Sequence, residues 1–281
     1  MRYFLFILVL LSVLSSCSEY QKALKSEDIA EKFKLGDSLY NLGKYEKANK
    51  LFAQIVPSYK GKPQAEKLMY LYSHSFYKMK DYYVAGYQFE RFVSSYPKSE
   101  KIEEAAFLSA KSYYMLSPLY TKDQKETKDA IEKLQNFINQ FPESEHVAEA
   151  NKLFKELEFK LEKKAFEIAK QYKVIAPGYT NDFNAAIKSF DNFLFEFPGS
   201  KLREDALFYR LDAVYQQAIN SQEYKNTTQR GVIALKKERL EKAKEYSDSF
   251  KKTFTNSKYM EDVNKMTSVI EEELKNYSTK S

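Results

Sequence analysis

The sequence predicts an all-α protein, a superhelical solenoid of about five helical hairpins closed by a C-terminal capping helix. Two observations predict this fold. The 281 residues include 7 Gly, 7 Pro and no Trp beside 45 Lys and Arg and 39 Asp and Glu, a composition that favours long helices over turn-rich sheets. In addition, aromatic and small residues recur along the chain with a fixed step, which is typical of stacked repeats.

The N-terminal segment reads as a targeting sequence. Arg2 precedes a largely apolar run from Tyr3 to Leu14, which is too short to cross a bilayer of about 30 Å. Leu14-Ser15-Ser16-Cys17 then resembles a bacterial lipobox, and Cys17 is the sole cysteine of the chain. We therefore expect a lipoprotein signal peptide over residues 1–16, lipidation of Cys17, a tether over residues 17–27, and the solenoid over residues 28–281. A plain secretory peptide or a buried cysteine is the alternative.

The repeat has a step of 37 residues. It relates three sets of positions, which are aromatic, small and tyrosine in turn: Phe33, Tyr70 and Phe107; Gly36, Ser73 and Ala110; Tyr40, Tyr77 and Tyr114. Small residues allow the two helices of a hairpin to approach closely, and aromatic residues fill the space between hairpins. Ala48 and Phe52 recur as Ala85 and Phe89 in the second helices.

Later repeats are longer. About eight residues are inserted after Ser117, and the pattern of the second helix then resumes at Ala130 and again at Ala186. Three second helices end in the aromatic-Pro-x-Ser turns that contain Pro97, Pro142 and Pro198, in which proline stops the helix and serine can cap the next one. We expect one long helix from Asn151 to Val174 and a polar last helix over residues 258–277. A long coiled coil is excluded because heptads are not sustained.

The repeats resemble the tetratricopeptide pattern. In the first unit Leu35-Gly36, Gly43-Lys44-Tyr45, Ala48 and Phe52 fall at the spacings of that family, whereas Lys32 replaces its usual first aromatic residue. The resemblance implies that the first helix of each hairpin lines a groove for an extended peptide. By spacing, the groove residues are Phe33, Asp37, Tyr40, Asn41, Tyr70, His74, Tyr77, Lys78, Phe107, Lys111, Tyr114 and Met115. Phe33, Tyr70 and Phe107 could instead pack between hairpins.

An enzyme, a cofactor site and a metal site are not expected. The chain has 2 His and 1 Cys, which nearly excludes a structural zinc site, and it contains no phosphate-binding glycine loop and no recognisable nucleophile motif. Basic runs such as Lys236-Lys237-Glu238-Arg239 are interleaved with glutamate and indicate a solvated helix face rather than a nucleic-acid site.

The lipobox and five uneven tetratricopeptide units together resemble the BamD family of outer-membrane β-barrel assembly lipoproteins. The region from Ser117 to Gln217 carries the more specific part, including Lys163-Lys164-Ala165-Phe166 and Arg203-Glu204-Asp205-Ala206-Leu207. The segment from Ser221 to Leu235 and the tail beyond Ser257 depart from the family.

This resemblance implies a non-enzymatic assembly factor, anchored by lipid to the periplasmic face of the outer membrane. Its first half would bind unfolded outer-membrane β-barrel proteins, and its second half a BamA-type barrel subunit. The alternatives are a generic periplasmic tetratricopeptide lipoprotein that scaffolds cell-envelope complexes, and a glycan-binding lipoprotein. The absence of Trp disfavours the glycan-binding protein.

Overall fold

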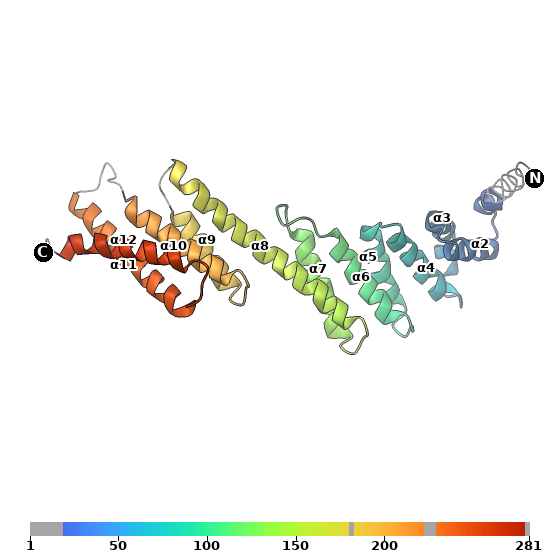
Figure 1. Cartoon of the computed structure of the whole chain (residues 1–281). Coiled ribbons are helices and arrows are strands. Elements are labelled where there is room, and N and C mark those ends of the chain that lie inside the picture. Colours follow the sequence, from blue (N-terminus) through green and yellow to red (C-terminus); the bar gives the residue numbers. More distant parts are fainter. Residues whose placement is uncertain (1–18, 180–182, 222–228, 279–281) are drawn as a thin grey trace, which may run out of the picture. The chain divides into compact units, whose positions relative to one another are not determined.

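The structure is a computed structural model that describes residues 19–179, 183–221 and 229–278, and every described regular element is helical (Figure 1). The signal peptide and Cys17 therefore lie outside the described residues. Within the described ranges, no helix is both long enough and apolar enough to cross a membrane. The chain divides into two compact units, residues 1–158 and 159–281, and the boundary falls inside helix α8.

The first unit consists of three consecutive helical hairpins and the start of α8. In each hairpin the first helix packs against the second, and the first helices of neighbouring hairpins also lie side by side. The prediction of helical hairpins is therefore confirmed for this unit. Its helices are α2 (Ile29–Asn41), α3 (Tyr45–Ile55), the short 3-10 helix η1 (Val56–Tyr59), α4 (Ala65–Lys78), α5 (Tyr82–Ser95), α6 (Ile102–Leu116), α7 (Lys125–Gln140) and α8 (Val147–Tyr179).

The second unit is likewise built from helices that pack against their neighbours in the sequence. Helix α10 contacts α9, α11 and α12, and the last helix therefore covers the end of the stack as a polar cap would. The predicted long helix and last helix are both present, with α8 extending somewhat beyond the expected bounds. The helices after α8 are α9 (Asn184–Glu196), α10 (Arg203–Ile219), α11 (Gln229–Thr253) and α12 (Met260–Ser278).

The repeated small and aromatic residues form the core. In three second helices the repeated triplet of one alanine and two larger apolar residues is buried: Ala85, Phe89 and Phe92; Ala130, Leu134 and Phe137; Ala186, Phe190 and Phe193. In the first hairpin a Cβ atom at Gly36 would lie 2.6 Å from Cε1 of Phe52. This distance confirms that a small residue permits the close approach of α2 and α3.

The serines after the helix-ending turns join successive repeats. Ser99 Oγ accepts from the backbone N–H of Lys101 at 3.0 Å and donates to Glu66 Oε1 at 2.5 Å. Ser200 likewise donates to Glu162 at 2.6 Å, and Ser257 to Glu204 at 2.6 Å. The sequence predicts that these serines cap the helices that follow them. This prediction is wrong for Ser99, because its hydroxyl bonds within the turn before α6 and does not cap that helix.

The first unit begins earlier than expected. Residues 19–25, which the sequence assigns to the tether, form a helix that places Tyr20 and Ala23 in the first core cluster. Lys32, the residue that departs from the tetratricopeptide pattern, supports this helix from α2. Its ammonium group donates to Gln54 Oε1 at 2.7 Å and to the carbonyl oxygen of Leu24 at 3.5 Å.

Candidate functional site

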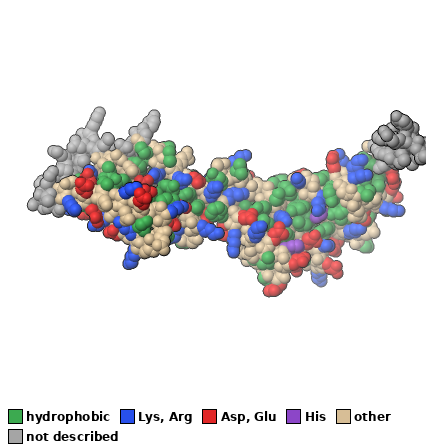
Figure 2. All heavy atoms as spheres, viewed as in Figure 1, with side chains coloured by type: hydrophobic (Ala, Val, Ile, Leu, Met, Phe, Trp, Pro, Cys, Tyr) green, Lys and Arg blue, Asp and Glu red, His purple; other side chains and the backbone are tan. Residues whose placement is uncertain are grey.

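The first helices of the first unit bring four of the expected groove residues together. Tyr40 on α2 and Tyr70, His74 and Tyr77 on α4 form a continuous set of ring contacts, which we call the ring row. His74 is its centre, because its imidazole stacks on Tyr70 and Tyr77 with centroid distances of 5.8 and 6.2 Å. In Figure 2 histidine side chains lie among hydrophobic side chains on the visible face of this unit.

The position of these rings follows from the helical period. Tyr70, His74 and Tyr77 are separated by four and three residues, so they lie on one face of α4. Tyr40 reaches this face from the neighbouring hairpin, and its hydroxyl group forms a hydrogen bond with Nδ1 of His74. The 37-residue step therefore correctly predicted that Tyr40 and Tyr77 occupy equivalent places on adjacent first helices.

The ring row is uncharged at neutral pH. Burial, with a smaller contribution from the ammonium group of Lys78, lowers the pKa of His74 to about 4. Burial also raises the pKa of Tyr40 to about 12 and raises the pKa values of Tyr70 and Tyr77. The row therefore presents neutral rings with polar edges, which suit apolar side chains and main-chain groups of a peptide.

Ion pairs frame the ring row. Lys67 on α4 reaches Asp37 on α2 at 2.8 Å, and Lys111 on α6 reaches Glu149 on α8 at 2.7 Å. The sequence predicts that Asp37 and Lys111 line the groove. In the structure their ion pairs also connect adjacent first helices. Tyr114 also connects α6 to α8, because its hydroxyl donates to Glu156 Oε2 at 2.7 Å.

Lys101 and Glu104 form a further pair beside Tyr70, with 2.9 Å between Nζ and Oε2. The ammonium group of Lys101 lies 5.6 Å from the centroid of the Tyr70 ring. Burial alone would raise the pKa of the Glu104 carboxyl, but hydrogen bonds from Lys101 and Tyr70 outweigh burial and lower it. Sequence reasoning missed this pair, although the 37-residue step relates Glu104 to Lys67 and could have drawn attention to it.

Two expected groove residues belong to the core instead. Phe33 stacks on Tyr59 in the first core cluster, and Phe107 packs between Phe137 and His146. Their exposed fractions are 9% and 3%, so neither ring offers a ligand much surface. Phe33 and Phe107 therefore pack between hairpins, which was the alternative to a position in the groove. His146, which the sequence did not single out, covers Phe107 with a centroid distance of 4.6 Å.

Three other expected groove residues lie at the C-terminal ends of first helices. Asn41, Lys78 and Met115 are exposed, and the structure does not bring them into the ring row. Among the described residues, no group of three or more His, Cys, Asp or Glu side chains lies close enough to hold a metal ion.

The family comparison agrees with this architecture. The YfiO family, described as "Outer membrane lipoprotein", matches residues 25–176, which is more than half of the chain and includes all of the ring row. The chain belongs to the YfiO family. YfiO is the family of BamD, a lipoprotein of tetratricopeptide type, so the resemblance found in the sequence is confirmed and an outer-membrane location follows.

This YfiO-family protein can also be compared with curated proteins and with solved structures. No curated protein matches the chain. Among solved structures, the chain is similar to the "TPR2AB-domain:pHSP90-complex of yeast Sti1". The sequence identity is 14%, the TM-score is 0.40, and the match covers 86% of this chain and 98% of that one.

Proposed function

We propose that this YfiO-family protein is a non-enzymatic, lipid-anchored component of the outer-membrane β-barrel assembly machinery. The ring row carries the proposal. Four adjacent rings on two neighbouring first helices, uncharged and framed by ion pairs, form a surface for an extended peptide with aromatic side chains. The C-terminal strand of an unfolded barrel protein is such a peptide.

The dimensions of the ring row suit this ligand. The ring centroids of Tyr40 on α2 and His74 on α4 lie 5.8 Å apart, which is close to the spacing of about 6.6 Å between side chains two positions apart on one face of an extended chain. Rings from α2 and α4 can therefore contact side chains two positions apart on one bound strand. The exposed amide of Asn41 and ammonium of Lys78, at the helix ends, are available to main-chain groups or a terminal carboxylate.

The second unit supports docking of a barrel subunit of the BamA type. Ile168, Tyr172 and Ile175 on α8 are spaced by four and three residues and therefore lie on one helix face. Their exposed fractions are 41, 41 and 56%, so they form an apolar stripe on the surface of this unit. Exposed apolar stripes of this kind mark protein interfaces. The stripe lies on a different unit from the ring row, so we assign it a separate partner.

Affinity capture from detergent-solubilised membranes tests the proposal. We expect the wild-type protein to recover the barrel assembly subunit, and the Ile168→Glu, Ile175→Glu double variant to lose it while remaining folded. Lys188→Glu with Lys201→Glu, at exposed positions of the same unit, is the matched control and should recover the subunit normally. Recovery of peptidoglycan-associated partners in place of the barrel subunit would favour the generic envelope scaffold instead.

A further inference from the structure

The first unit contains a cleft with a volume of about 570 Å³ that the ring row does not use. The cleft opens between η1 and α5, and α4 forms its floor through Leu68 and Met69, which are both buried. Tyr59, Tyr72 and Tyr96 line its walls. We call it the tyrosine cleft. Its size falls within the range of pockets that hold small ligands or peptide side chains.

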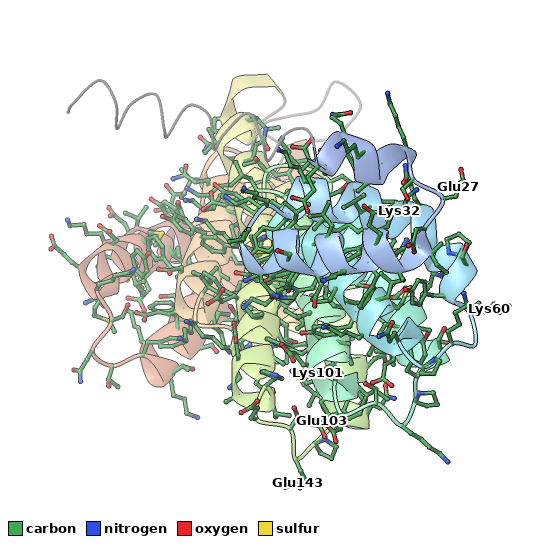
Figure 3. All side chains as sticks on the ribbon, turned by 90° about the vertical axis from the view of Figure 1, so that its right-hand side faces the viewer. Glu27, Lys32, Lys60, Lys101, Glu103 and Glu143 are labelled. Atoms are coloured by element: carbon green, nitrogen blue, oxygen red, sulfur yellow. The ribbon has the colours of Figure 1, made fainter. Side chains whose placement is uncertain are left out.

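The tyrosine cleft and the ring row lie on opposite sides of α4. A helix turns by about 100° per residue. Leu68 and Tyr72, which face the cleft, are therefore turned by about half a revolution from Tyr70 and His74, which face the ring row. In Figure 3, Lys60, which lines the cleft, lies at the right-hand edge of the view, and Lys101, whose ammonium group lies beside Tyr70 of the ring row, lies toward the middle. A ligand in the cleft would not compete with one on the ring row.

The rim of the cleft is positively charged. Lys60 and Arg91 are among its lining residues, and no Asp or Glu is. The guanidinium group of Arg91 donates to the neutral carboxamide of Gln88 at 3.2 Å, and within the described ranges neither cation forms an ion pair with a carboxylate. Lys67, Lys101 and Lys111 around the ring row all have such partners. Lys60 and Arg91 are therefore available to pair with the carboxylates of a ligand.

We propose that the tyrosine cleft is a second protein-docking site, and that it takes an acidic peptide segment carrying a large apolar side chain. The apolar side chain would lie on Leu68 and Met69, and the carboxylates would meet Lys60 and Arg91 at the rim. A peptide fits better than a lipid chain, because the hydroxyls of Tyr72 and Tyr96 and the amide N–H groups of Gln88 can satisfy main-chain groups. An acyl chain would offer these groups no hydrogen-bond partner.

Fluorescence anisotropy on the purified mature chain tests this proposal with a labelled peptide, Glu-Asp-Phe-Leu-Asp-Glu. Two control peptides carry lysine at every acidic position or alanine at both apolar positions. One variant, Lys60→Glu with Arg91→Glu, reverses the charge of the rim, and a second, Ala53→Trp, fills the cleft without changing charge. Lys98→Glu with Lys128→Glu, at exposed positions outside the cleft lining, is the matched control for charge.

We expect the acidic peptide to bind the wild-type protein and both control peptides to bind at least about tenfold more weakly. Both cleft variants should weaken the acidic peptide by a similar factor, whereas the Lys98, Lys128 control and a Tyr40→Ala, Tyr77→Ala variant should bind it normally. Lack of binding to the wild type at about millimolar peptide would overturn the proposal, as would full binding to a folded Ala53→Trp variant. Displacement of the peptide by decanoate at lower concentrations than by unlabelled peptide would show a site for fatty acids instead.

Discussion

Tyr40 and His74 join two hairpins through a hydrogen bond between a phenol hydroxyl and an imidazole nitrogen, with ring centroids 5.8 Å apart. Because His74 also stacks on Tyr70 and Tyr77, this bond links α2 to the whole ring row. The tautomer of His74 decides whether Nδ1 accepts from the Tyr40 hydroxyl or donates to it, and burial keeps the imidazole neutral at pH 7 by holding its pKa near 4. The same side chains thus connect the hairpins and form the candidate binding surface.

The first prediction concerns pH. The pKa of His74 is lowered from 6.5 to about 4 in the folded protein, so between these values the unfolded chain binds a proton that the folded chain does not. Stability contributed by neutral His74 is therefore complete above about pH 6.5 and is lost as pH falls toward 4. The full shift corresponds to about 3 kcal/mol, and partial exposure reduces the expected loss to about 1–2 kcal/mol. Denaturant unfolding at pH 7 and pH 4.5 measures it.

The control for this prediction is His74→Gln, which cannot titrate in this range. The variant should show a smaller difference between the two pH values than the wild-type protein. Tyr40→Phe keeps the ring and removes the hydroxyl, so it should lower stability at pH 7 by about 1 kcal/mol. An equal pH dependence of the wild type and His74→Gln would show that His74 does not titrate as described.

The second prediction concerns helix packing in the first hairpin. Gly36→Ala places a methyl group 2.6 Å from the Phe52 ring, which is fully buried and has little room to move. Overpacking of this kind should lower the free energy of unfolding by about 1–3 kcal/mol, despite the better helix propensity of alanine. Gly199→Ala is the control, since nothing lies within 4 Å of its Cβ position. Equal stability of both variants would contradict the close approach of α2 and α3.

The third prediction concerns the serines that follow the turns. Ser200 donates to Glu162 and accepts from the backbone N–H of Leu202, so its hydroxyl joins one first helix to the start of the next. Ser200→Ala leaves a carboxylate without this donor and should cost about 1–2 kcal/mol, because hydrogen bonds to charged groups are stronger than neutral ones. Ser189→Ala on α9, outside any such turn, should cost much less. Chemical denaturation of the two variants makes the comparison.

The sequence allowed the helical hairpins to be predicted because the pattern is local. Ala48 and Phe52 lie four residues apart on one face of α3 and recur 37 residues later as Ala85 and Phe89, and burial of this face fixes where each second helix packs. The same periodicity could not separate core rings from surface rings. Phe107 and Tyr114 both lie on α6, seven residues apart, yet one is buried and the other reaches Glu156.

Contacts between hairpins were harder to predict than the hairpins themselves. The Tyr40–His74 bond depends on how far α2 and α4 are offset along their axes, which a step of 37 residues does not specify. The packing of residues 19–25 was missed because that segment is short and lies next to the expected lipidation site. The tyrosine cleft is lined in part by η1, which lies in the connection between α3 and α4. No sequence motif predicts this short helix, so the cleft could not be predicted.

The fourth prediction concerns membrane attachment. Cys17→Ala should give a folded protein that no longer fractionates with outer membranes, because Cys17 is the sole cysteine available for acylation. Fractionation after a salt wash, in cells that lack the protein's partners, makes the measurement, and Ser18→Ala serves as the control. Retention of the Cys17 variant in the membrane fraction under these conditions would show that another feature anchors the chain.

The most direct test of the central claim is the affinity of a C-terminal barrel-strand peptide for the Tyr40→Ala, Tyr77→Ala variant. Both rings are partly exposed, so their loss should weaken binding by at least about tenfold while the melting temperature falls only slightly. Phe52→Ala and Phe89→Ala, which remove buried rings, should instead cost about 3–5 kcal/mol of stability. If the double variant stays folded and binds the peptide as tightly as the wild type, the ring row is not the substrate site.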